Sequence, residues 1–153
     1  MSCTDSVLYQ SEVALPGSGW SYDQPASFEF DITDTTRSVN MLLNVSHSDA
    51  YQWQNLYLKL YTDFPGDRKD TQILSVELAD KTGRWYGERS GTIITAPILL
   101  QDHIRFELPG TYRLRIEQNM RVNPVPDVSG LELVLEKSEA LPAAPKDKEK
   151  KTK

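Results

Sequence analysis

The side chains that carry most enzymatic and metal chemistry are scarce in this sequence. It contains two histidines, His47 and His103, and one cysteine, Cys3, and neither histidine has a second His or Cys at metal-ligand spacing. There is no nucleophile elbow, phosphate-binding glycine loop or zinc-protease motif. The acidic residues leave a carboxylate pair for sugar hydrolysis open, but none stands out at the required separation. We therefore expect no enzymatic activity, no metal and no cofactor.

His103 is the histidine whose surroundings are easiest to predict. It falls in phase with Arg105 and Glu107, on the outward face of an expected strand, and we interpret it as a solvated surface residue. Asp102 precedes it directly, and neighbouring residues of a strand point to opposite faces. The sequence therefore does not predict a catalytic pair between Asp102 and His103.

Aromatic side chains are the next candidates, because they stack on sugars and anchor protein interfaces. Tyr57 and Tyr61 share the face of their expected strand that lies opposite Leu56, Leu58 and Leu60. If no other strand covers that face, the two tyrosines form an exposed contact surface. The other large aromatics either extend such a platform or close the ends and turns of the fold: Trp20, Tyr51, Trp53, Trp85 and Tyr86.

Strands must position these side chains, because apolar residues between Val7 and Lys137 recur with a period of two. The expected inward faces are Phe28, Phe30 and Ile32; Val39, Met41, Leu43 and Val45; Leu56, Leu58 and Leu60; Leu74, Val76 and Leu78; Ile104, Phe106 and Leu108; Tyr112, Leu114 and Ile116; and Leu131, Leu133 and Leu135. Strands that are apolar on one side belong to antiparallel sheets. The sequence predicts an all-β, antiparallel two-sheet β-sandwich, jelly-roll-like, in a single domain.

Turn residues and composition divide the chain. Glycine in Asp80-Lys81-Thr82-Gly83 predicts a turn with Gly83 in a left-handed conformation, and two prolines make residues 123–127 a loop between the last two strands. We expect an N-terminal tether over residues 1–6 and the β-sandwich over residues 7–137. Residues 138–153 carry a dense charge run without aromatics, which predicts a disordered tail.

Charge excludes one large class of partner. The chain has 153 residues, 39% of them hydrophobic, and a formal net charge of −5. Five lysines lie in the last eight residues, so residues 1–145 hold twelve Lys and Arg against twenty Asp and Glu, a net of −8. Nucleic acid is a poor partner for such a body, because phosphate binding needs a positive surface. No apolar run is long enough for a transmembrane helix.

Several short motifs follow one another across residues 7–136. They are Leu15-Pro16 followed by Trp20; Asn55-Leu56-Tyr57-Leu58; Leu78-Ala79-Asp80 with Gly83, Trp85 and Gly87; Pro109-Gly110-Thr111-Tyr112; and Glu117-Gln118-Asn119-Met120-Arg121. In this order and spacing the motifs resemble the gliding-motility lipoprotein family GldH of the Bacteroidetes. The resemblance covers most of the chain and brings no catalytic residues with it.

The resemblance implies a noncatalytic lipoprotein of the outer membrane. Its implied partners are envelope proteins of the gliding motility machinery, which is linked to protein export by the type IX pathway. Ser2-Cys3 matches the end of a lipoprotein processing box, so Cys3 is the expected lipidation site and membrane contact runs through the lipid anchor. Only one acidic residue, Asp5, follows closely, which favours the periplasm-facing leaflet.

The last of these motifs contains a polar residue on an inward face. Gln118 and Met120 continue the phase of Tyr112, Leu114 and Ile116, and a buried glutamine without hydrogen bonds costs about 1–3 kcal/mol. We expect Gln118 to bond backbone groups near the end of the strand rather than a ligand. The candidate interaction surface consists of these residues: Tyr57, Tyr61, Trp53 and Arg121.

Two other functions stay open at this point. A carbohydrate-binding module would hold peptidoglycan or a polysaccharide on two or more aromatic faces that are coplanar and open to water. A protein partner instead needs aromatics ringed by polar residues. The second of the two other functions is that of an envelope glycosidase. The expected function is an interaction component of the envelope.

Overall fold

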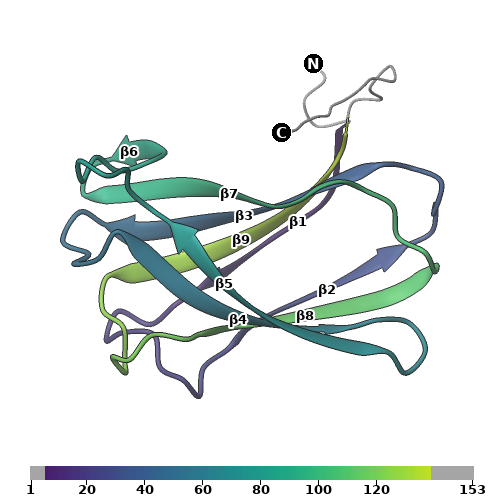
Figure 1. The fold of residues 1–153 in the computed structure, drawn as a ribbon, viewed down its shortest axis with the longest axis horizontal. Helices are drawn as coiled ribbons and strands as arrows, with labels where there is room; N and C mark the ends of the chain where they lie inside the picture. Colours follow the sequence, from purple (N-terminus) through teal and green to yellow (C-terminus); the bar gives the residue numbers. More distant parts are fainter. Residues whose placement is uncertain (1–5, 139–153) are drawn as a thin grey trace.

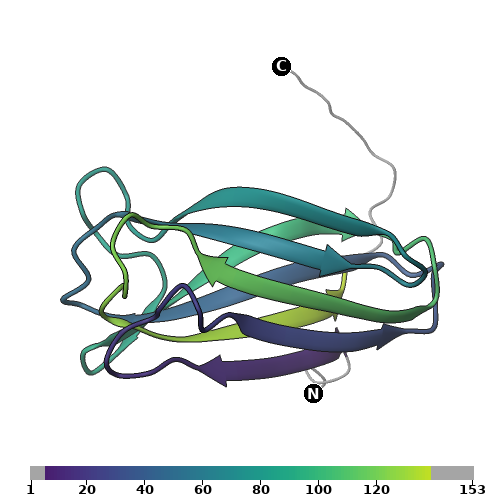
Figure 2. The same ribbon diagram turned by 90° about the horizontal axis from the view of Figure 1, so that it is seen from below.

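The computed structural model describes residues 6–138, which fold into two antiparallel sheets packed face to face (Figure 2). The strands are β1 (Val7–Ala14), β2 (Ala26–Ile32), β3 (Val39–Ser48), β4 (Asn55–Asp63), β5 (Lys69–Glu77), β6 (Glu88–Ser90), β7 (Ile93–Ile104), β8 (Gly110–Gln118) and β9 (Val128–Lys137). The described residues contain no helix long and apolar enough to cross a membrane. The predicted all-β sandwich is confirmed.

The order of the strands is that of a jelly roll. One sheet has the order β1-β9-β3-β7-β6 and the other β2-β8-β4-β5, so most connections cross from one sheet to the other (Figure 1). The first and last strands, β1 and β9, are neighbours, with Val7 paired to Glu136. Such crossing connections between two antiparallel sheets form the double Greek key of a jelly roll.

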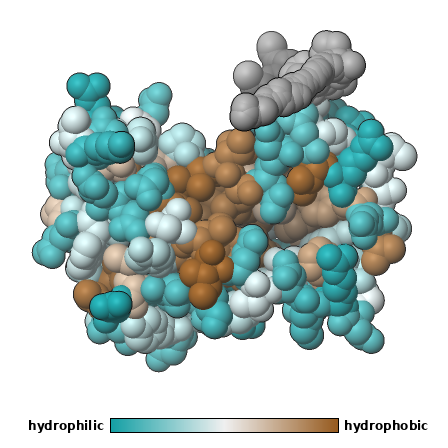
Figure 3. All heavy atoms as spheres, viewed as in Figure 1, coloured by the Kyte–Doolittle hydropathy of each residue, from teal (hydrophilic) through white to brown (hydrophobic). Residues whose placement is uncertain are grey.

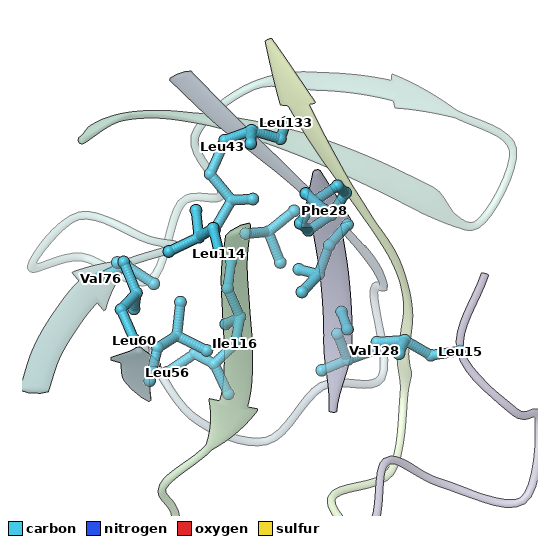
Figure 4. Close-up of a cluster of buried hydrophobic side chains, with 14 of the residues drawn as sticks. Leu15, Phe28, Leu43, Leu56, Leu60, Val76, Leu114, Ile116, Val128 and Leu133 are labelled. Atoms are coloured by element: carbon cyan, nitrogen blue, oxygen red, sulfur yellow. The ribbon is translucent and has the colours of Figure 1, made fainter. Parts of the chain in front are cut away.

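The core forms because each strand turns one apolar face to the opposite sheet. In β2 the burial alternates strictly, with Phe28 and Phe30 buried and Glu29 exposed between them. Side chains from both sheets meet in the middle, as Leu43 and Leu133 do with Leu114 (Figure 4). Each fully buried aliphatic side chain contributes about 1.5–3 kcal/mol relative to an exposed one, so this layer stabilises the fold most.

One end of the sandwich is closed by Trp20 and by the end of β8. Trp20 is fully buried and pairs with Val125 through two backbone hydrogen bonds. Gln118 is 2% exposed, its Oε1 accepts from Met120 N at 2.8 Å, and its Nε2 donates to the Val122 carbonyl at 3.1 Å. The prediction that Gln118 bonds backbone groups at the strand end is confirmed.

Two glycines take up positive φ for different reasons. Gly83 has a φ of +89° in the predicted turn, where the Asp80 carboxylate accepts from the amides of Thr82 and Arg84. Gly87 has a φ of +100°, and a Cβ there would lie 1.9 Å from the carbonyl oxygen of Thr95 in β7. The predicted left-handed Gly83 is confirmed. At Gly87 the backbone itself must approach a neighbouring strand.

The expected strand over Ile104, Phe106 and Leu108 is wrong. β7 ends at Ile104, and the residues after it form a loop in which Phe106 is buried and Leu108 is 47% exposed. Phe106 contacts Tyr112 edge-on with ring centroids 4.8 Å apart, so its burial reflects a loop side chain set into the core. The strand in this part of the chain is β7 itself, which the alternation did not indicate because Pro97 interrupts an apolar run.

Candidate interaction surface

Tyr57 and Tyr61 lie on the outer face of the four-stranded sheet, as their alternation predicted. Both belong to β4, which has β8 on one side and β5 on the other. Tyr57 is 45% exposed and Tyr61 is half-buried. Among the described strands none covers this face, because the second sheet packs against the opposite one.

Charged neighbours hold the ring of Tyr61 in place. The Arg115 guanidinium lies over the ring, 4.1 Å from its centroid, and the Lys59 ammonium lies 5.3 Å from it. The Tyr61 hydroxyl donates to the Glu117 carboxylate at 3.1 Å. Cations over an aromatic face are attracted by about 0.5–1 kcal/mol each at exposed sites. The face of Tyr61 is therefore already occupied by side chains of this chain.

Tyr57 is positioned by the segment that follows β8. Its carbonyl accepts from Asn119 N at 2.7 Å, and its amide lies 3.3 Å from the sulfur of Met120. Arg121 comes next in the chain and is exposed. The structure thus places Tyr57 beside the backbone that leads into Arg121.

Trp53 lies in a different environment from the two tyrosines. It precedes β4, is half-buried and packs against the core, and its ring contacts Tyr51 edge-on with centroids 5.4 Å apart. Tyr51 is buried, which raises the pKa of its phenol well above the ordinary 10. The structure makes Trp53 part of an aromatic plug at the end of the sandwich. Cys3, the expected lipidation site, lies outside the described residues.

Ion pairs extend the outer face across β8 to β2. The Arg113 guanidinium pairs with the Glu29 carboxylate at 3.1 Å, and a shallow depression of about 320 Å³ lies over Ser27, Glu29, Tyr61, Asp63, Arg113 and Arg115. Both signs of charge are interspersed with the tyrosines. Such a mixture of aromatic and arginine side chains with polar surroundings is typical of protein interfaces.

A second recess, which the sequence analysis did not predict, opens between the two sheets. Its volume is about 290 Å³, and its lining includes Met41, Leu60, Phe64, Leu100, Ile104 and Phe106. Hydrophobic residues gather across the middle of the face seen in Figure 3. Arg68 and Glu107, which form an exposed ion pair of 3.6 Å, also border the recess. Alternation had placed Met41, Leu60 and Ile104 on inward faces, but it did not indicate that they border a recess.

The two histidines have unlike environments. His47 is fully buried against Trp85, with ring centroids 4.6 Å apart, and its Nε2 has no hydrogen-bond partner among residues 6–138. Burial lowers the pKa of its imidazole below the ordinary 6.5. His103 lies at the surface as expected, but its φ of 53° brings its ring against the Asp102 carboxylate. The expectation that these two side chains point apart was wrong, because the strand is no longer regular there.

No group of three or more potential metal ligands occurs among residues 6–138. The four residues predicted to form one surface lie in different places. Tyr57 and Tyr61 belong to the exposed face of β4, Arg121 follows the segment beside Tyr57, and Trp53 belongs to the aromatic plug.

Solved structures with a similar arrangement of strands are distant. A family GH115 4-O-methyl-α-glucuronidase with specificity for decorated arabinogalactans aligns with a TM-score of 0.41 and 13% identity, over 87% of this chain and 18% of the other. An infectious bursal disease virus structure (Gt strain) aligns with a TM-score of 0.35 and 14% identity, over 83% of this chain and 30% of the other. Likenesses of this size support no inference about function.

Sequence relatives are closer. The chain is 26% identical over 131 residues to a gliding motility lipoprotein GldH homolog of Christiangramia forsetii, covering 86% of this chain and 78% of the relative. It is 25% identical over 132 residues to the gliding motility lipoprotein GldH of Flavobacterium johnsoniae, covering 86% and 81%. The pattern of the family described as GldH lipoprotein matches residues 7–133, nearly the whole described sandwich. The chain therefore belongs to the GldH lipoprotein family, as its sequence motifs indicated.

Proposed function

We propose that this chain is a noncatalytic, lipid-anchored protein of the cell envelope that binds a protein partner of the gliding motility and type IX secretion apparatus. The observation that carries the proposal is the uncovered outer face of the four-stranded sheet, on which exposed Tyr57 stands near Tyr61 and paired charges. Tyrosine and arginine dominate the binding energy of many protein interfaces. The gliding motility lipoproteins related to this chain support the cellular context.

In this proposal Cys3 is the residue to which the lipid is attached. Lipid attached there would hold the sandwich on the outer membrane, facing the periplasm. Strand β1 begins at Val7, four residues after Cys3, so the anchor lies at most about 14 Å from the start of the strand. A domain tethered so closely meets partners at the membrane surface.

Carbohydrate binding is the alternative that this surface supports less well. A sugar stacks on an aromatic face that is open to water, and the Tyr61 face is covered by Arg115. Tyr57 offers a single exposed ring on this face, whereas a sugar-binding platform needs two or more. Trp53 does not add to it, because its ring packs against Tyr51 and the core. A protein partner can use Tyr61 and Arg115 together, as a preformed pair.

The partner surface is tested by quantitative co-purification from the native envelope in mild detergent. Tyr57→Ala and Tyr61→Ala should reduce the recovery of specific envelope proteins while the urea midpoint changes little, because outer-face residues contribute little to the core. Leu8→Ala, a change of another exposed side chain on the other sheet, is the control and should leave recovery unchanged. Equal recovery with all three variants would refute a contact through the tyrosines.

The anchor is tested by fractionating cells that produce the chain behind a lipoprotein signal segment. Cys3→Ser should move the protein from the membrane fraction to the soluble fraction and abolish function, with the urea midpoint of the sandwich unchanged. A Cys3→Ser protein that stays in the membrane and works would contradict attachment at this residue. An insertion of about twenty Gly/Ser residues after Ser6 would extend the average reach to roughly 25 Å and shows whether the distance matters.

A further inference from the structure

Strand β5 has an unpaired edge. It ends the four-stranded sheet, and among the described residues only β4 pairs with it. Just beyond the two ends of β5, the Phe64 amide donates to the Arg68 carbonyl and the Leu78 amide donates to the Gln54 carbonyl. Both positions next to β5 are even-numbered, so the even-numbered residues of β5 form the backbone hydrogen bonds to β4. Because hydrogen-bonded and non-hydrogen-bonded pairs alternate along an antiparallel ladder, the amides and carbonyls of Thr71, Ile73 and Ser75 point away from β4.

The other edge strands are protected, and β5 is not. β2 carries Glu29 and Asp31, β6 has only three residues, and β1 is interrupted by a bulge between Val7 and Tyr9. Short strands, charges and bulges are the usual devices that keep sheet edges from pairing. β5 is nine residues long and has an uncharged centre, residues 71–76, in which Ile73 is 59% exposed.

The sequence of β5 is complementary to itself. When two copies of Lys69–Glu77 run antiparallel with Ile73 opposite Ile73, Lys69 lies opposite Glu77 of the second copy, twice by symmetry. Thr71 then lies opposite Ser75, and the two exposed isoleucines cover each other. Opposite charges, hydroxyl pairs and β-branched pairs each stabilise antiparallel strands when directly opposed. In the single chain the Lys69 ammonium lies 3.1 Å from the Asp63 carboxylate, and both side chains are exposed.

We propose that β5 pairs with β5 of a second copy of this chain, forming a symmetric dimer with one continuous eight-stranded sheet. The two-fold axis is perpendicular to the sheet, so both outer faces lie on the same side. Thr71 pairs with Tyr61 of its own chain, and Ser75 pairs with Tyr57. When Thr71 of one copy lies opposite Ser75 of the other, Tyr61 of the first copy and Tyr57 of the second therefore lie on one line across the joined sheet. The dimer thereby joins the two tyrosine surfaces into one.

The same symmetry places both five-stranded sheets together on the opposite side. β1, which begins four residues after Cys3, belongs to that sheet, so both lipid anchors can enter one membrane. This orientation rests on the proposed function, whereas the strand pairing does not. Confinement of tethered copies to one surface raises their effective concentration and favours the dimer.

The pairing is tested with the whole 153-residue chain carrying Cys3→Ser, by sedimentation over a range of concentrations. We expect a reversible monomer–dimer equilibrium. Lys69→Glu and Glu77→Lys should each weaken the dimer about tenfold, because each creates two like-charge pairs, and the double variant should restore it. Ile73→Lys should abolish the dimer, whereas Leu8→Lys, at an exposed position of the β1 edge, should not. Urea unfolding of the variants confirms that each is folded.

The register is tested with a thiol at the axis. Ile73→Cys, in the same Cys3→Ser chain, should be joined into covalent dimers by a short bis-maleimide cross-linker, and Leu8→Cys should not. A monomer at all concentrations, or a charge cycle without restoration, would overturn the proposal. So would a monomer whose β5 variants lose an envelope partner, because β5 would then accept a strand of a different protein. Sedimentation and cross-linking use the purified chain alone, and loss of an envelope partner is measured by the co-purification described above. A failed dimer test therefore leaves the proposed surface of Tyr57 and Tyr61 a separate question.

Discussion

Gly83 and Gly87 allow the conformational cost of a side chain to be separated from the cost of a clash. Both have positive φ, +89° and +100°, a range that side chains with a Cβ rarely adopt. A Cβ on Gly83 would meet no atom within 4 Å, so Gly83→Ala should destabilise the protein by about 1–2 kcal/mol, the conformational cost alone. This change is the reference for the second one.

Gly87→Ala adds a backbone collision to that cost. Its Cβ would lie 1.9 Å from the Thr95 oxygen, 2.7 Å from the Thr95 carbonyl carbon and 2.9 Å from the Ala96 Cα. These are atoms of β7 that cannot rotate away, so the segment entering β6 must move off the sheet. Overpacking of this kind typically costs about 1–3 kcal/mol, and we expect a total loss of about 3 kcal/mol.

Urea unfolding followed by tryptophan fluorescence measures both losses, with the slope of the transition shared by all variants. Gly66→Ala, with a φ of +82° and open space around the Cβ, is the second reference and should match Gly83→Ala. Thermal midpoints should fall by about 4 °C for each kcal/mol in a domain of this size. If Gly87→Ala costs no more than Gly83→Ala, the close approach of this segment to β7 does not exist in solution.

Three further changes test buried groups. Because burial lowers the pKa of His47 below 6.5, the unfolded chain binds a proton that the folded protein excludes. The urea midpoint should therefore fall as the pH drops from 7 through 6.5 toward 5, and His47→Phe should reduce that fall; an unchanged fall in His47→Phe would contradict the role of His47. Phe106→Ala should lower the free energy of unfolding in urea by about 3 kcal/mol and Leu108→Ala by less than about 1 kcal/mol. Equal losses would instead support a strand that buries both side chains. Gln118→Leu should cost about 1–3 kcal/mol, because it leaves buried backbone groups unbonded, and an unchanged midpoint would contradict this role.

Alternation in the sequence predicted the strands that turn a single face to the core. β2, β4 and β8 have a regular inward set, such as Leu56, Leu58 and Leu60, and the outward position of Tyr57 follows directly from it. β7 escaped prediction because its apolar residues do not alternate and Pro97 interrupts them. The pattern at Phe106 misled because one aromatic ring in a loop can be buried as deeply as a strand residue.

The rest of the candidate site depends on which strands are neighbours, and no local pattern contains that information. The free edge of β5 follows from the order of the four-stranded sheet, and the recess between the sheets requires β5 and β7 to border the same side. The inward phase of Val39, Leu43 and Val45 continues to His47, which is buried as that phase requires. No local pattern indicates that the ring covering it is Trp85, which comes from a distant part of the sequence. Separation of Trp53 from the tyrosines also required the tertiary structure.

The adjacency of β1 and β9 has a consequence for how the chain acquires its structure. Among the described strands β1 pairs only with β9, with Val13 opposite Leu131 and Val7 opposite Glu136, so its partner exists only after residues up to 136 have been made. Pairing between such distant segments carries a large loop-closure entropy and makes folding slow. β3, the other neighbour of β9, can pair with β7 earlier and gains its second neighbour only with β9. We therefore expect the five-stranded sheet to close only after β9 has emerged from a ribosome or a translocation channel.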